Sequence, residues 1–152
     1  MKYLRFLVIT GFLAGFSLMI GCGGDDTPDI TPEQEQIEKL TATWAISNVT
    51  LDGADRSADW TGFTLTATGT LTYSTTNSGD DNVWPTSGTW SFAGTEGAGL
   101  NVLNRSDGVT VNIDAITETS LDLSFTFALA SPNKESRVAS IEGDWVFELT
   151  KQ

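Results

Sequence analysis

Apolar and polar residues alternate at every second position over most of the chain after residue 41. The clearest case is 121–129, where apolar residues occupy the odd positions and Asp, Ser, Thr and Ala the even ones. Further alternating segments are 63–68, 71–74, 109–114 and 145–150. Segments 44–51, 88–92 and 100–104 bring the count to about eight. Such alternation is typical of antiparallel strands with one buried and one solvated face, so we expect an all-β fold.

The connections between these segments are short and carry turn residues. Asp107-Gly108 is a typical hairpin pair, and in 68–70 we expect Gly69 to adopt the left-handed conformation. About eight antiparallel strands in roughly 110 residues can form an up-and-down barrel or a two-sheet sandwich. Hairpins between neighbouring strands favour the barrel, because closure also removes the exposed edges.

A short helix is predicted over 31–40, before the first strand. Thr31 is a suitable N-cap, Pro32 occupies the first helical position, and Gln34 completes a capping box. Ile37 and Leu40 are its apolar positions. A helix this short is unstable alone, so we expect it to dock on the strands.

The first 21 residues are typical of a signal peptide. Lys2 and Arg5 precede an apolar run over 6–20, which is shorter than the about 20 residues needed to cross a bilayer. The run ends in Leu-Met-Ile-Gly-Cys over 18–22, and this motif resembles the lipobox of bacterial lipoproteins. The resemblance implies cleavage before Cys22, a diacylglyceryl group on its sulfur and an acylated amino terminus, hence a membrane anchor without a transmembrane helix. The alternatives are an ordinary secretory signal with an incidental cysteine, or an uncleaved anchor helix.

Residues 22–30 follow as a polar segment of Gly, Asp, Thr and Pro with little to bury, and we expect a flexible tether. Its acidic residues resemble the surface-export signals of Bacteroidetes lipoproteins, although a plain solvated spacer fits equally well. The predicted location is therefore the bacterial cell envelope, with the outer membrane favoured and the leaflet left open.

Several short motifs within 41–152 resemble the lipocalin-like domains of Bacteroidetes lipoproteins. They are Trp44, the segments 59–63 (Asp-Trp-Thr-Gly-Phe), 83–85 (Val-Trp-Pro) and 88–90 (Gly-Thr-Trp), and the terminal segment 142–149. Ala42 stands where lipocalins proper have the glycine of a Gly-x-Trp motif. The resemblance implies an eight-stranded barrel, one end of which is closed by the helix over 31–40.

Charge and composition narrow the function. The chain of 152 residues has 20 acidic and 8 basic groups, for a net charge of −12. Loss of the leader would remove Lys2 and Arg5 and leave 6 basic groups against 20 acidic ones, or −14. A surface this acidic repels phosphate backbones, which excludes nucleic acid as a partner. With no histidine and a single cysteine, the chain lacks Ser-His-Asp triads, Cys-His dyads and Cys/His zinc sites, so we predict no enzyme and no cofactor.

The five tryptophans are the candidate ligand contacts, since aromatic rings bind sugar faces and apolar ligands. Three of them are in phase with apolar neighbours and are assigned to the core: Trp44, Trp90 and Trp145. Trp60 follows Asp59 in a predicted loop and Trp84 precedes Pro85 near the start of a strand, so either could be exposed, with a place in the core as the favoured alternative. Together with Tyr73, they are the candidate ligand-binding residues. Most inward side chains are large, so we expect a small or end-on cavity rather than a deep calyx.

Acidic clusters are weaker candidates. The loops 52–59 and 77–82 contain Asp side chains that could hold Ca²⁺, but neither follows the EF-hand order. Glu142 and Asp144 could form a carboxylate pair for glycoside hydrolysis. In a chain with 20 acidic residues such clusters arise by chance. We therefore favour solvated turns and predict no metal and no catalytic residue.

Together these features predict a non-enzymatic, lipid-anchored envelope protein whose lipocalin-like barrel binds a small apolar or glycan ligand. The alternative is a structural or protein-interaction module of an envelope complex without a small-molecule ligand. A cavity lined by Trp60, Tyr73 or Trp84 would favour the first function. A solid core with one exposed apolar patch would favour the second.

Overall fold

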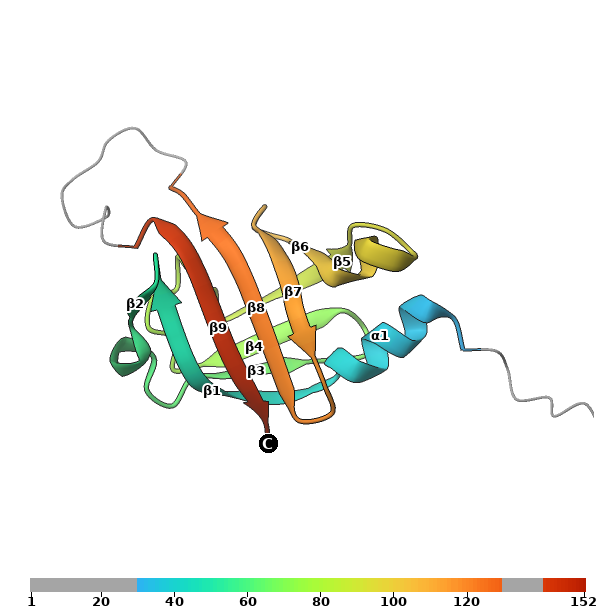
Figure 1. Cartoon of the computed structure of the whole chain (residues 1–152), viewed down its shortest axis with the longest axis horizontal. Coiled ribbons are helices and arrows are strands. Elements are labelled where there is room, and N and C mark those ends of the chain that lie inside the picture. The colour runs from blue at the N-terminus through green and yellow to red at the C-terminus, as the bar shows by residue number, and fades with distance from the viewer. Residues whose placement is uncertain (1–29, 130–140) are drawn as a thin grey trace, which may run out of the picture.

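The computed structural model describes residues 30–129 and 141–152 (Figure 1). In this part of the chain one α-helix, α1 (Pro32–Leu40), precedes nine strands. The strands are β1 (Ala42–Leu51), β2 (Ala54–Asp55), β3 (Thr64–Ala67), β4 (Thr72–Thr76), β5 (Ser87–Phe92), β6 (Val102–Arg105), β7 (Thr110–Ile116), β8 (Ser120–Phe127) and β9 (Gly143–Lys151). Two 3-10 helices lie in connections: η1 (Ser57–Trp60) and η2 (Gly97–Asn101). The expected leader over 1–21 and the expected tether over 22–30, except Ile30, lie outside the described residues.

Eight of the strands form one closed antiparallel barrel. They pair in the order β1-β3-β4-β5-β6-β7-β8-β9, and β9 pairs with β1 to close the sheet. Trp44 lies opposite Leu65 of β3 on one side and Lys151 of β9 on the other, so β1 joins the two edges of the sheet. β2 is a two-residue addition paired with the end of β1. The predicted up-and-down barrel is confirmed.

The two ends of this barrel are covered differently. The end that we call the plugged end carries the β1–β3, β4–β5 and β6–β7 connections. The other, which we call the helix end, carries α1, η2, the β3–β4 and β7–β8 turns and the last residues of β9 (Figure 1). The chain therefore enters the barrel at the helix end.

The inward positions of the alternating strands form the core. Along β8 and β9, for example, Leu121, Leu123 and Phe147 are completely buried. The three tryptophans assigned to the core, Trp44, Trp90 and Trp145, are at most 5% exposed. Full burial of a Leu or Phe side chain such as these stabilises the folded state by about 1.5–3 kcal/mol. The period-two pattern thus correctly identified the inward face.

The predicted helix is confirmed as α1. The Thr31 hydroxyl accepts a hydrogen bond from the Gln34 amide (3.2 Å), and Pro32 is the first helical residue. Leu40 is buried as expected, whereas Ile37 is only half-buried. Gln36 is also buried, and its Nε2 donates to the Leu100 carbonyl and to Asn101 Oδ1, both at 3.3 Å. Within the described ranges no helix is long and apolar enough to cross a membrane.

Two local expectations were wrong. In the β3–β4 turn the left-handed residue is Leu71 (φ 58°) rather than Gly69. The strand expected over 100–104 begins only at Val102, because the preceding residues form η2. In the β6–β7 turn, however, Gly108 has φ 89°, as the Asp-Gly pair predicts. Turn residues indicate where the chain reverses, but the pairing of the neighbouring strands determines which turn residue adopts a positive φ.

Candidate functional site

Trp60, Tyr73 and Trp84, the candidate ligand-binding residues, all lie inside the barrel. They are 1%, 3% and 1% exposed. Trp60 and Trp84 belong to connecting segments that fold inward at the plugged end, so their indole rings fill the interior. None of the three rings presents a face to solvent. A ligand that packed against the faces of these rings would therefore have to lie within the barrel.

These rings belong to one continuous aromatic core. Trp60 packs edge-to-face on Phe147 (4.8 Å between centroids), and Trp84 packs on the same ring from 5.2 Å. Phe63 contacts both tryptophans, at 5.2 and 6.0 Å. Edge-to-face pairs add about 0.5–1.5 kcal/mol each beyond area burial. The plugged end is thus closed by mutually supporting aromatic rings.

Arg105 is a buried charge that the sequence reasoning missed. Its side chain has no exposed surface. Its Nε donates to Asp107 Oδ1 (3.1 Å), its Nη2 pairs with Asp107 Oδ2, and its Nη1 donates to the Val83 carbonyl (3.1 Å). The guanidinium also lies over the Trp84 ring, 4.8 Å from its centroid. A signal was present in the sequence, because Arg105 continues the inward phase of Leu103 and Asp107 follows two residues later.

Three buried donors near Arg105 have no hydrogen-bond acceptor among the described residues: the Tyr73 hydroxyl and the Nε1–H groups of Trp84 and Trp90. Burial raises the pKa of Tyr73, and the charge of the nearby Arg105 guanidinium and its hydrogen bond to the phenol oxygen partly offset this effect. The phenol therefore stays protonated at neutral pH. By contrast, Trp44 and Trp145 donate from Nε1 to the carbonyls of Leu40 and Ile141, both at 2.9 Å.

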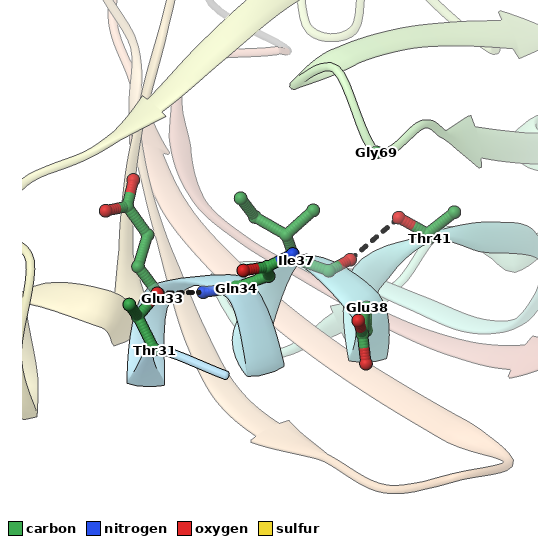
Figure 2. Close-up of a pocket in the computed structure, with 7 residues that line it drawn as sticks. All are labelled: Thr31, Glu33, Gln34, Ile37, Glu38, Thr41 and Gly69. Atoms are coloured by element: carbon green, nitrogen blue, oxygen red, sulfur yellow. Dashed lines mark hydrogen bonds between the residues drawn. The ribbon is translucent and has the colours of Figure 1, made fainter. Parts of the chain in front are cut away.

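The larger open hollows lie at the helix end, on either side of α1. We call the first the α1–β3 hollow; it has a volume of about 540 Å³ and is drawn in Figure 2. It is lined by Thr31, Glu33, Gln34, Ile37, Glu38, Thr41 and Gly69. In Figure 2 the Ile37 side chain points away from the helix on the side of the Gly69 turn, and Glu38 points the other way. This hollow combines one aliphatic side chain with acidic and hydroxyl groups.

The second, the α1–β7 hollow, has a volume of about 840 Å³. It is lined by Glu35, Glu38, Lys39, Ile116, Thr117, Glu118, Thr119 and Lys151. The Lys39 ammonium, 2.7 Å from Glu35 Oε1, holds the pKa of that carboxyl below its ordinary value. Lys151 Nζ lies 5.9 Å from the Trp44 ring centroid. Charges of both signs therefore surround this hollow.

A smaller hollow of about 250 Å³ opens at the plugged end. Trp60 and Trp145 line it together with Arg56, Asp59, Gly79, Asp80 and Ile141. Gly79 covers the Trp60 ring closely: a Cβ at this position would lie 3.0 Å from the ring and 2.6 Å from the Asp59 carbonyl oxygen. Only part of the Trp60 ring can therefore contact a molecule in this hollow.

Several acidic residues of the predicted clusters accept hydrogen bonds from nearby backbone amides and from one hydroxyl group. Asp80 accepts from the Asn82 amide (2.8 Å), and Asp52 accepts from the Asp144 amide (2.9 Å). Glu142 accepts from the Leu129 amide (3.1 Å), and Asp144 accepts from the Thr126 hydroxyl (2.6 Å). Within the described ranges no group of three or more Asp, Glu, Cys or His residues is arranged to hold a metal ion.

Cys22, the predicted lipidation site, lies outside the described residues. The chain matches no family model, no curated protein and no solved structure.

Proposed function

We propose that this protein is a lipid-anchored component of the bacterial cell envelope, and that its barrel is a non-enzymatic protein-interaction module of an envelope complex. The observation that carries the proposal is the filled interior. Trp44, Trp60, Trp84, Phe63 and Phe147 are each at most 1% exposed. A lipocalin-like barrel that carried a sizeable apolar ligand would need that space for the ligand.

In this proposal the protein is anchored through a lipid on Cys22, and the basis for this anchor is the resemblance of residues 18–22 to a lipobox. The tether over 22–30 leads directly into α1, and at full extension it would span about 30 Å. The helix end would therefore face the membrane, and the plugged end would point away from it. The net charge of −14 that would remain after loss of Lys2 and Arg5 with the leader favours a partner with a basic surface and disfavours close contact with anionic lipid head groups.

Binding of a small ligand is the second candidate function. The α1–β3 and α1–β7 hollows favour it, since their volumes of about 540 and 840 Å³ lie in the range of ordinary ligand sites. Carboxylate and hydroxyl groups line both hollows beside a larger apolar surface, which suits a molecule with both polar groups and apolar faces, such as a glycan.

The anchor is tested by moving the cysteine. In the full-length chain expressed in bacteria, we expect Cys22→Ser to abolish incorporation of labelled palmitate and to release the protein from the membrane fraction. The matched control combines Cys22→Ser with Ser17→Cys, which keeps one cysteine but removes it from the predicted cleavage site. Palmitate incorporation into either variant would contradict lipidation at Cys22.

The interaction function is tested by cross-linking the protein in intact cells, followed by mass spectrometry of proteins, lipids and glycans that co-purify with it. We expect a specific cross-linked protein and no small molecule in stoichiometric amount. A stoichiometric lipid or glycan without a cross-linked protein would contradict the proposal and support the second candidate.

A further inference from the structure

Four side chains form one polar cluster inside the barrel: Tyr73, Trp84, Trp90 and Arg105. Trp90 and Arg105 are register partners on β5 and β6. Tyr73 packs against both tryptophans, with 6.4 Å between its ring centroid and that of Trp84 and 5.5 Å to that of Trp90. Each of the four residues is at most 5% exposed, so the cluster is closed off from bulk solvent.

This cluster has more hydrogen-bond donors than acceptors. The Tyr73 hydroxyl and the indole N–H groups of Trp84 and Trp90 find no acceptor in the part of the chain that the structure describes. Arg105 directs two nitrogens at Asp107 and one at the Val83 carbonyl, which leaves further N–H groups on a guanidinium that carries five. Buried donors without an acceptor are unfavourable, and native proteins pair nearly all of them. The cluster therefore calls for an acceptor that its own side chains do not supply.

The charges in the cluster select the kind of acceptor. The Asp107 carboxylate already compensates Arg105, so a buried anion would lose its hydration without gaining an unpaired cation. A neutral hydroxyl oxygen can accept hydrogen bonds from two of these three donors and brings no charge into the core. We propose that the Tyr73–Trp84–Trp90–Arg105 cluster is a binding site for one neutral hydroxyl oxygen. Either water or the hydroxyl group of a small neutral ligand such as a sugar supplies it.

This site goes beyond the proposed function, because it needs neither the lipid anchor nor a protein partner. Gly88 lies directly against the Tyr73 hydroxyl, because a Cβ on Gly88 would lie only 2.7 Å from the hydroxyl oxygen. The absence of a side chain at Gly88 thus lets Tyr73 lie against β5. Tyr73→Phe keeps this packing and removes only the hydroxyl, so it probes the hydrogen bond alone.

The first test compares Tyr73→Phe with Thr75→Val in the full-length chain. Thr75 is a matched control on the same strand, because it is 8% exposed and its hydroxyl donates to the Pro85 carbonyl at 3.0 Å. If the Tyr73 hydroxyl is paired with a bound oxygen, both variants raise the unfolding equilibrium constant in urea by about five- to ten-fold. If Tyr73→Phe leaves stability unchanged or increases it, the hydroxyl lies in a dry core and the proposal is overturned.

The second test observes the indole N–H signals of the ¹⁵N-labelled full-length chain by NMR. Trp44 and Trp145, which donate to backbone carbonyls, serve as internal controls. We expect Trp84 and Trp90, and neither control, to respond to the bound oxygen. Cross-peaks to water that persist when glycerol or glucose is added identify water as its source. Selective shifts of Trp84 and Trp90 on addition of glycerol or glucose identify a ligand hydroxyl. If neither indole shows either response, the proposal is overturned whatever the effect of Tyr73→Phe.

Discussion

The plugged end and the helix end of the barrel are closed by opposite means. At the plugged end, connecting segments turn inward and bury Trp60 and Trp84 almost completely. At the helix end, α1 covers the barrel from outside; Gln36 and Leu40 are its buried residues, and the α1–β3 and α1–β7 hollows flank it. The comparison indicates that the plugged end contributes most to stability, while the helix end offers the larger accessible surface for binding.

The two ends are closed differently because the interior of the barrel must be filled by side chains. An eight-stranded barrel has an interior that side chains must occupy if no ligand does. The aromatic rings of the plugged end supply that volume. A helix with Glu at positions 33, 35 and 38 cannot supply it without burying charge, so it remains on the outside.

The largest expected effect is at the plugged end. Trp84→Ala removes a ring that contacts Phe63, Tyr73 and Phe125, and we expect it to lower the free energy of unfolding by about 3–5 kcal/mol. Urea denaturation measures this value. Ile37→Ala, at the half-buried apolar position of α1, is the control at the helix end and should cost about 1 kcal/mol. An equal loss in the free energy of unfolding for the two variants would show that the plugged end contributes no more to stability than the helix end.

The second prediction concerns the buried ion pair. Asp107→Asn leaves the Arg105 guanidinium buried without a compensating charge, and we expect a loss of about 2–3 kcal/mol. This lies at the lower end for buried pairs because the Asp107 side chain is 29% exposed. Arg105→Met replaces the buried charge with an apolar chain and should cost less. The reverse order in urea denaturation would show that the pair itself, rather than compensation of the charge, stabilises this end.

The third prediction addresses how α1 is attached. Gln36→Ala removes the hydrogen bonds to Leu100 and Asn101, and we expect a loss of about 1–2 kcal/mol in the free energy of unfolding. Gln34→Ala changes an exposed glutamine of the same helix and should change stability by less than about 0.5 kcal/mol. Amide hydrogen exchange of α1 should increase in the first variant only. If the exchange of α1 is unchanged in Gln36→Ala, other contacts hold the helix.

The smallest effect is expected on the wall between the two ends. Desolvation raises the pKa of Asp122, and the neighbouring Glu148 and Asp114 raise it further. An acid whose pKa is raised by folding lowers stability once the pH exceeds its unfolded pKa. Asp122→Asn should therefore stabilise the protein slightly at pH 7, and the gain should vanish below about pH 3.8, the ordinary pKa of the group. Thermal unfolding at the two pH values measures it, and an equal gain at both would rule out this charge effect.

Much of the fold could be predicted from the sequence, whereas only part of the candidate site could. The alternation around Leu121, Leu123 and Phe147 identified the inward face, because a strand with one wet side must place apolar residues at every second position. The sequence indicates Tyr73 and Trp84 as aromatic candidates, and the two rings pack against each other in one cluster. Arg105 was missed, since a charged residue in an inward phase is uncommon and the composition of the strand does not reveal the carboxylate that compensates it.

The strand pattern, the inward face and the short capped helix can be read from the amino-acid sequence, because they depend on periodicity and on local hydrogen bonding. The burial of Trp60 and Trp84 inside the barrel and the position of α1 outside it depend on how the strands pack in three dimensions. Both tryptophans are in connecting segments without periodicity, so their burial depends on the space that closure of the sheet leaves between distant strands. The same closure brings Tyr73 of β4 against Trp90 of β5, the register partner of Arg105, which no spacing along the chain predicts.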